Sequence, residues 1–363
     1  LLQCNPNVNV QDFEGKTPFF LCCCVGDIKV AETLVSAGAD IHLPTYTGVS
    51  PFMAACQYGQ LDMVTWMVEH HSIDVNHTDD AGNSPLLMAA RMMRKDVMKY
   101  LIKSGADVNH VNKSGVSALM TVNESSADAL PVLESGYDVQ DTIVDTTTNR
   151  LQCAKLLLQT GVSIDAVDSN QQTALHMASR YGRLPLVELL LSHHSNPHQR
   201  DIYGNTALHL AIQHQHRHTA VELIRHMEDV NIRNNLGHTP LHTLCYLPLN
   251  SPVAGELLDL LCEKGADVNA KDVTKTSPIC TLCKQNNLPL AKHLLTKGAD
   301  NHSRSALGMS IVHEVLMLPN TPLCDLEVSH DGVQIQHPQI SVLKWLLEDE
   351  KLDINIQDLF GLT

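Results

Sequence analysis

Histidine and cysteine are the residues of this sequence best suited to chemistry, with 21 histidines and 11 cysteines in 363 residues. Imidazoles and thiolates at matched spacing bind zinc, and the Cys-x-x-Cys pair Cys280 and Cys283 has a spacing that zinc and redox sites use. Two further groups of histidines lie close together: His193, His194 and His198, and His214, His216 and His218. Neither group has cysteine or acidic partners at matched spacing, so we expect no metal site and no cofactor.

Four other histidines are spread along the chain. His176, His209 and His242 each follow a threonine by three residues and are separated by one 33-residue interval. His313 follows Ser310 in the same way. Residues separated by a whole structural unit do not surround one ion, so we interpret these histidines as structural.

The cysteines also recur at one position. Cys23, Cys56, Cys245 and Cys283 each lie six residues after a Ser or Thr that opens a helix. A free cysteine behaves as a small hydrophobic residue, so this position is a packing slot and the redox or zinc interpretation of Cys280 and Cys283 is the weaker one. We expect all eleven thiols to be free, which favours the cytosol or the nucleus.

Composition excludes several classes of function. The sequence holds 25 basic and 40 acidic side chains, a formal charge of −15, which disfavours nucleic acid and favours a basic or neutral protein or peptide partner. No apolar run approaches the roughly 18 residues that span a bilayer, so we expect no direct membrane insertion. No phosphate-binding loop, nucleophile elbow, HExxH motif or pair of carboxylates suited to catalysis is present, so we expect no enzyme.

A 33-residue period organises the sequence. Residues 168–200 and 201–233 both open with Asp and a polar turn, continue with Thr-Ala-Leu-His, and end in a second apolar segment. Ser or Thr at a helix N-cap accepts an otherwise unpaired backbone N–H, and Pro in the next position loses no hydrogen bond. The period therefore predicts two helices in each repeat. The residues that open the first helices are Thr17, Ser50, Ser84, Ser117, Thr173, Thr206, Thr239, Ser277 and Ser310.

These openers divide the chain into nine repeats within residues 12–357. The expected repeats are 12–44, 45–78, 79–111, 112–167, 168–200, 201–233, 234–271, 272–304 and 305–357. Residues 1–11 match the end of a preceding repeat and 358–363 the start of a further one. We therefore expect this chain to be a segment of a longer protein.

Thr-Ala-Leu-His at 173–176 and 206–209, with Thr-Pro-Leu-His at 239–242, resembles the ankyrin repeat. The resemblance implies an all-α solenoid of helix-turn-helix units with projecting hairpin fingers. It also implies that the repeated histidine bonds the threonine hydroxyl and neighbouring backbone. Asp-x-x-Gly segments such as Asp201 to Gly204 would form the fingers, where Gly tolerates a positive φ.

The resemblance further implies a concave groove that binds a partner, made by finger tips and by the seventh and eighth residues after each opener. Five of the seven tyrosines fall on this surface, and Tyr and Arg are frequent interface anchors. Isolated exposed aromatic residues would be the alternative explanation. The expected groove residues are Phe13, Tyr46, Gln57, Tyr58, Arg91, Met92, Arg180, Tyr181, Ile202, Tyr203, Gln213, His214, Leu236, His238 and Tyr246. Asparagines of the inter-repeat turns match a hydroxylation position of the family: Asn76, Asn109, Asn231, Asn269 and Asn355.

Three insertions interrupt the period, at about 127–149, 247–252 and 319–338. Each is expected to be a loop between the two helices of its repeat, because Pro cannot continue a helix and the longest insertion is acidic. Solvated loops are the simpler interpretation of the acidic insertions, and docking of a basic partner is the alternative.

Two functions remain open. The chain could be a scaffold or adaptor segment that binds a protein in the groove. It could instead be a structural ankyrin stalk or assembly region of a larger protein, such as a channel or a multi-subunit complex.

Overall fold

The computed structural model describes residues 7–124, 146–249, 251–316 and 338–348. These residues form helices and connecting segments, with one isolated β-bridge between Val111 and Ser117. The chain divides into two compact units. The N-terminal unit holds residues 1–178 and 188–196, and the C-terminal unit holds residues 179–187 and 197–363.

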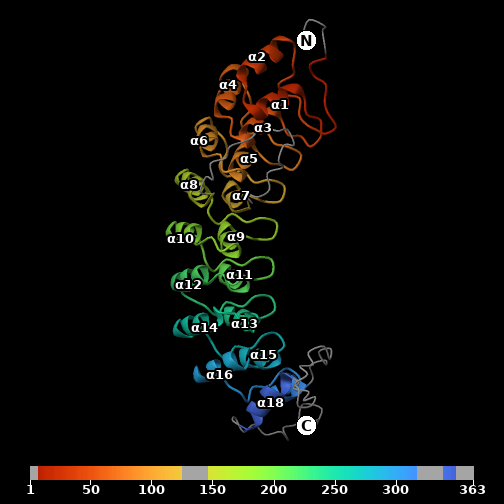
Figure 1. Cartoon of the computed structure of the whole chain (residues 1–363). Coiled ribbons are helices and arrows are strands. Elements are labelled where there is room, and N and C mark those ends of the chain that lie inside the picture. The colour runs from red at the N-terminus through yellow and green to blue at the C-terminus, as the bar shows by residue number, and fades with distance from the viewer. Residues whose placement is uncertain (1–6, 125–145, 250, 317–337, 349–363) are drawn as a thin grey trace, which may run out of the picture. The chain divides into compact units, whose positions relative to one another are not determined.

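In the described part, two helices fall in each expected repeat (Figure 1). The N-terminal unit contains α1 (Pro18–Val25), α2 (Ile28–Ser36), α3 (Pro51–Tyr58), α4 (Leu61–His71), α5 (Pro85–Arg91), α6 (Lys95–Lys103), α7 (Ala118–Glu124) and α8 (Thr146–Gln159). Helices α9 (Ala174–Arg180) and α10 (Leu184–Ser192) contribute residues to both units. The C-terminal unit contains α11 (Ala207–Gln213), α12 (Arg217–His226), α13 (Pro240–Cys245), α14 (Ala254–Glu263), α15 (Pro278–Lys284), α16 (Leu288–Thr296), α17 (Ile311–Leu316) and α18 (Pro338–Glu348).

Within each unit, the first helix of a repeat packs on the first helix of the next repeat, and the second helix on the next second helix. Helix α3 lies between α1 and α5, and α13 lies between α11 and α15. Helix α14 lies between α12 and α16 in the parallel row. The predicted all-α solenoid is confirmed.

First helices begin where the sequence predicts, and in several of them the opening Ser or Thr caps the first turn. Thr17 Oγ1 accepts the N–H of Phe20 at 3.1 Å, and Ser50 Oγ accepts that of Met53 at 3.2 Å. Pro18 and Pro51 occupy the first helical position, where an N–H would have no partner. The first helices are therefore specified by local sequence.

The boundaries of two insertions differ from expectation. Helix α8 begins at Thr146, so residues 146–149 belong to a helix and not to the insertion expected at 127–149. Pro338, expected to close the third insertion, is the first residue of α18. Pro is favoured at that position because its fixed φ suits the first turn. Residues 125–145 and 317–337, the rest of the two acidic insertions, lie outside the described residues.

Consecutive fingers are joined by backbone hydrogen bonds. In the N-terminal unit, the Asp80 N–H donates to the Thr47 carbonyl at 3.1 Å, and in the C-terminal unit the Val273 N–H donates to the Leu236 carbonyl at 3.2 Å. The Asp201 carboxylate also accepts the N–H groups of Tyr203 and Asn205 within its own finger. These bonds hold the finger tips in a fixed position on the surface.

The cysteine slot is buried as predicted. Cys23, Cys56, Cys245 and Cys283 are each no more than 2% exposed, and all nine cysteines of the described residues are free. Burial raises the pKa of the Cys22 thiol to about 11 and that of Cys24 to about 12, so the reactive thiolate is scarce at neutral pH.

We expect the nine described cysteines of the native protein to react slowly with iodoacetamide at pH 8. Among the described cysteines, Cys262 should react first, because the other eight are buried. Peptide mapping after brief native alkylation checks this order. Alkylation under denaturing, non-reducing conditions should add eleven labels to the intact mass, and fewer would mean that a disulfide is present.

Candidate functional site

The repeated histidines connect neighbouring repeats. His209 Nδ1 accepts the backbone N–H of Thr206 at 3.1 Å and lies 2.9 Å from its hydroxyl, and the ring's Nε2 reaches the His238 carbonyl of the next repeat at 3.1 Å. His242 makes the same contacts with Thr239, and its Nε2 reaches the Thr276 carbonyl at 3.3 Å. The predicted structural role of these histidines is confirmed by these bonds.

Burial lowers the pKa of both His209 and His242 to about 4. The loss of hydration disfavours the imidazolium, and the carbonyl bond at Nε2 offsets this only in part. Both rings are therefore neutral at physiological pH and act as connectors of the fold.

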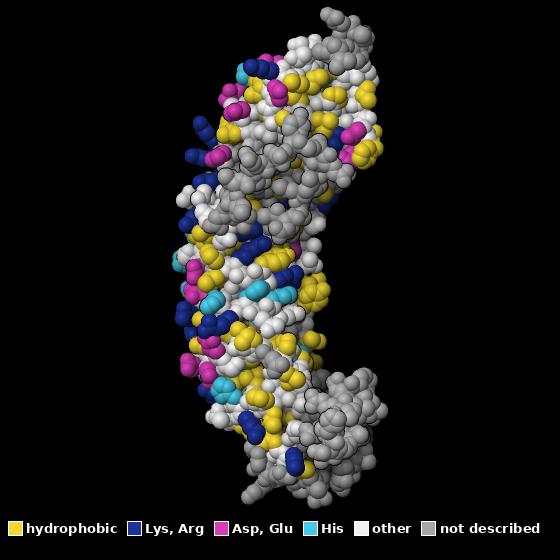
Figure 2. All heavy atoms as spheres, viewed as in Figure 1, with side chains coloured by type: hydrophobic (Ala, Val, Ile, Leu, Met, Phe, Trp, Pro, Cys, Tyr) yellow, Lys and Arg dark blue, Asp and Glu magenta, His cyan; other side chains and the backbone are white. Residues whose placement is uncertain are grey.

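The predicted groove residues are largely at the surface. The finger tips Phe13, Tyr46 and Tyr203 are 89%, 66% and 66% exposed. Tyr181 and Tyr246, at the ends of first helices, are each 50% exposed. The other members divide as follows: Ile202, Gln213, His214 and Leu236 are exposed, and Gln57, Tyr58, Arg91, Met92, Arg180 and His238 are partly buried. Figure 2 shows hydrophobic side chains at the edge of the molecule beside α11 and α13, where fingers end.

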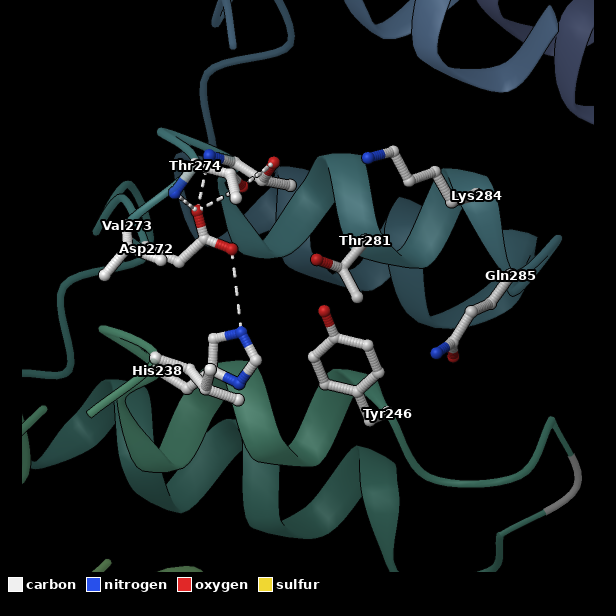
Figure 3. A pocket seen from close by; sticks show the side chains of 10 residues that line it. His238, Tyr246, Asp272, Val273, Thr274, Thr281, Lys284 and Gln285 are labelled. Carbon is white, nitrogen blue, oxygen red and sulfur yellow. Dashed lines mark hydrogen bonds and ion pairs between the residues drawn. The ribbon is translucent and has the colours of Figure 1, made fainter. Parts of the chain in front are cut away.

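A pocket of about 250 Å³ lies on this surface, between repeats seven and eight (Figure 3). Three of the predicted residues line it: Leu236, His238 and Tyr246. Repeat eight supplies the remaining residues of the lining: Asp272, Val273, Thr274, Thr276, Thr281, Lys284 and Gln285. The pocket thus brings together two fingers and the first helices α13 and α15.

One wall of the pocket is a column of rings. His238 stacks on His242 with 5.5 Å between ring centroids, and it contacts the ring of Tyr246 at 5.1 Å. In Figure 3 the rings of His238 and Tyr246 rise from the α13 side toward the residues of repeat eight. This wall offers an aromatic surface to an apolar or planar side chain.

The opposite wall is polar. One oxygen of Asp272 accepts the backbone N–H groups of Thr274 and Thr276, both at 2.8 Å, and its other oxygen lies 3.6 Å from His238 Nε2. Lys284 is ion-paired with Glu314. The pocket therefore combines apolar finger tips and an aromatic wall with a few polar groups, as binding pockets generally do.

The sequence interpretation missed Lys284 and Gln285, although the rule that found Tyr246 applies to them. They are the seventh and eighth residues after the opener Ser277, as Arg180 and Tyr181 are after Thr173. Val273 is a finger tip like Ile202 and is 66% exposed.

Within the described residues, no group of three or more His, Cys, Asp or Glu side chains could hold a metal ion. Cys280 and Cys283 are each 2% exposed in α15. No helix of the described ranges is long and apolar enough to cross a bilayer.

Comparison with known families assigns the repeats. A model described as ankyrin repeats in three copies matches residues 42–112 and 185–272, a second, described as ankyrin repeats in many copies, matches 157–211, and a single-repeat model matches 14–46. The chain belongs to the ankyrin-repeat family. Ankyrin repeats are generally protein-interaction modules, and their fold is typically a scaffold without catalytic activity.

Relatives and solved structures agree with the ankyrin assignment. The chain is 26% identical over 204 residues to alpha-latroinsectotoxin-Lt1a of Latrodectus tredecimguttatus, covering 54% of this chain and 14% of the toxin. It is 26% identical over 179 residues to transient receptor potential cation channel subfamily A member 1 of Drosophila melanogaster, covering 48% of this chain and 13% of the channel. The crystal structure of the human ASB11 ankyrin repeat domain aligns with a TM-score of 0.55 at 20% identity, covering 68% of this chain and 98% of that domain.

The turn asparagines of these ankyrin repeats bridge successive turns. Asn231 donates to the Gly265 carbonyl at 3.0 Å and accepts the Asp267 N–H at 2.7 Å. Asn76 and Asn269 make the same pair of bonds to the following repeat, and Asn109 accepts the Ser163 N–H. Asn355 lies outside the described residues. Hydroxylation of these residues stays a prediction.

Proposed function

We propose that this chain is a scaffold or adaptor segment that binds a protein or peptide along its finger tips and the ends of its first helices. The observation that carries the proposal is the set of large apolar and aromatic side chains exposed at the finger tips, on backbone that hydrogen bonds hold in place. Tyr203 is 66% exposed, and its carbonyl accepts the N–H of Asn235 from the next finger at 3.0 Å.

An exposed aromatic ring on a rigid backbone suits binding for a physical reason. Tyr has two side-chain torsions and its backbone position is already ordered here, so little conformational entropy is lost when a partner covers it. Burying such a ring contributes about 2 kcal/mol or more at an interface centre. Tyr246, beside the pocket, meets the same conditions.

Binding should weaken about tenfold or more when Tyr203 or Tyr246 is changed to Ala, mainly through faster dissociation. A partner captured by crosslinking to the native chain and measured by surface plasmon resonance tests this. The melting temperature should change little, since both side chains are half exposed or more. Glu263→Ala on the second helix α14 is the matched control. Binding that survives both tyrosine changes but falls with the control would move the site to the second helices.

The alternative is a structural stalk or assembly region in which repeats contact other repeats. The similarity to the Drosophila channel supports this function, and the 179 matched residues cover 13% of that protein. Self-association in sedimentation velocity that is lost with Tyr203→Ala would favour the stalk over the adaptor.

For either function we propose a reducing compartment, the cytosol or the nucleus. The support is the burial of free thiols in the repeated slot, where oxidation would disturb packing.

A further inference from the structure

Four basic residues recur at one position in the fingers of the C-terminal unit. Arg200, Arg233, Lys271 and Arg304 each directly precede the first residue of a finger reversal; we refer to them as the finger cations. The fingers of the N-terminal unit carry no charge at this position, where Gln11, Pro44, Thr78, Val111 and Val167 stand. Positive charge therefore gathers on one set of fingers in a chain whose net charge is −15.

Each finger cation is held against the fingers by bonds to neutral groups. Arg200 Nε donates to the Gly204 carbonyl at 3.2 Å, and its Nη2 donates to the Asn235 side-chain oxygen of the next finger at 3.0 Å. Arg233 Nη1 donates to the Lys271 carbonyl at 2.6 Å. Lys271 Nζ and Arg304 Nη1 donate to the carbonyls of Arg304 and Gly308, each at 3.3 Å. A guanidinium has five donors, so Arg200 and Arg233 keep donors for a further acceptor.

Three of the finger cations, Arg200, Arg233 and Lys271, differ from several cations of the second helices in their partners. Within the described residues, Arg200, Arg233 and Lys271 form no ion pair with a carboxylate. Three cations in or at the ends of second helices do: Arg217 pairs with Glu256, Arg225 with Glu222, and Lys297 with Asp259. Two of the finger cations are followed by an aspartate that bonds to its own finger: Asp201 is 3% exposed and accepts the N–H groups of Tyr203 and Asn205, and Asp272 accepts those of Thr274 and Thr276.

The same fingers expose apolar tips two or three residues further along. Ile202 is 47% exposed, Leu236 58%, Val273 66% and Leu307 50%. Each finger from repeat six to repeat nine thus carries one finger cation and one exposed apolar tip. The pocket between Leu236 and Val273 lies within this row.

We infer that the fingers of repeats six to nine bind an acidic, extended protein segment that also carries apolar side chains. The inference rests on the proposed function and names the chemistry of its partner. Packed helical repeats are spaced by about 8 to 10 Å, and three residues of an extended polyproline-type chain span about 9 Å. A segment with an acidic residue at every third position would meet one finger cation per turn and place apolar residues on the tips between them. This partner differs from the basic or neutral one that the net charge favours, and peptides of opposite charge distinguish the two.

A synthetic peptide of four Glu-Leu-Pro repeats, labelled with fluorescein, tests the inference on the full chain by fluorescence anisotropy. Binding should weaken about tenfold or more in the variant Arg200→Gln, Arg233→Gln, Lys271→Gln, Arg304→Gln, because favourable charge raises association rates by about tenfold or more. Gln keeps an N–H donor for the carbonyl bonds, and melting curves check that the variant is folded. The single change Arg233→Gln should weaken binding by a smaller factor, and this variant tests the inference if the quadruple variant does not fold.

The matched control replaces four exposed lysines of second helices in the N-terminal unit, Lys29, Lys99, Lys103 and Lys155, with Gln, which changes the net charge equally. The inference is overturned if both variants weaken binding equally, or if the Glu-Leu-Pro peptide (the Glu peptide) does not bind. It is also overturned if a Lys-Leu-Pro peptide binds equally well. If oligo(dT) or phosphatidylserine vesicles bind more tightly than the Glu-Leu-Pro peptide, and lose affinity in the same finger-cation variant, the ligand is a nucleic acid or a membrane and not a protein segment. If a crosslinked partner still depends on Tyr203 while the Glu peptide fails, only the acidic chemistry is wrong; if both fail, the proposed function fails with it.

Discussion

Acidification from pH 6.5 to pH 4 is expected to destabilise the repeats around α11 and α13 by up to about 6 kcal/mol. His209 and His242 have a pKa of about 4 in the fold, whereas an exposed histidine has a pKa of about 6.5. The unfolded chain therefore takes up both protons first, and the folded state loses stability as pH falls through this window. Each ring contributes up to about 3 kcal/mol, because a difference of one pKa unit corresponds to about 1.4 kcal/mol.

Hydrogen exchange measured by mass spectrometry at pH 7 and pH 4.5 checks this, with rates corrected for the intrinsic pH dependence. Peptides from α11 and α13 should lose protection more than those from α3 and α5, where Met53 and Leu87 occupy the histidine position. The variant His209→Met, His242→Met should lose most of this acid sensitivity, while His218→Gln, which changes an exposed ring, should keep it. Uniform loss of protection in all repeats, unchanged in the double Met variant, would assign the acid sensitivity to other groups.

Gly237→Ala is expected to destabilise the stack of fingers seven and eight by about 2 to 4 kcal/mol. Gly237 has φ +75°, which costs an L-residue about 1 to 2 kcal/mol. A Cβ atom there would also lie 2.7 Å from the Val273 backbone nitrogen and 3.0 Å from the Asp272 carbonyl carbon. These are backbone atoms of the neighbouring finger, so finger eight would have to move and the Val273 to Leu236 hydrogen bond would lengthen or break.

Gly265→Ala is the matched control. Gly265 has φ +84°, but no atom lies within 4 Å of a Cβ placed there, so this change carries only the conformational cost. Urea denaturation should show a larger loss for Gly237→Ala, by roughly 1 to 2 kcal/mol. If the two variants lose the same stability, the close approach of the fingers contributes nothing. Binding of the Glu peptide should also fall in Gly237→Ala, since Leu236 and Val273 would separate.

The helical repeats could be predicted from sequence because their signals are local. Thr239 caps its helix through the His242 N–H only three residues away, and Pro240 occupies the first turn. The boundary of α8 was predicted less well. Residues 146–149 are Thr-Thr-Thr-Asn, without Pro or an apolar residue, and the helix there is supported from a distance, since Arg150 reaches the Val122 carbonyl of α7.

The candidate surface was predicted in part for the same reason. Tyr203 and Leu236 lie at fixed offsets within a repeat, so the family's pattern places them at finger tips. The same offsets would have found Lys284 and Gln285. The His238 and Asp272 pair was not predictable in this way, because its members are 34 residues apart and approach only when two fingers stack.

The sequence by itself determined the period, the helix openers, the buried cysteine slot and the histidines that follow each opener, because each depends on contacts or spacings of a few residues. Only the tertiary structure decided which charges are neutralised. Arg217 meets Glu256 at a separation of 39 residues, whereas Arg233 donates to a backbone carbonyl 38 residues away and meets no carboxylate of the described residues. Side-chain direction and the stacking of neighbouring repeats, not residue type, therefore leave Arg200, Arg233 and Lys271 without a carboxylate partner among the described residues, in a chain whose overall charge is negative.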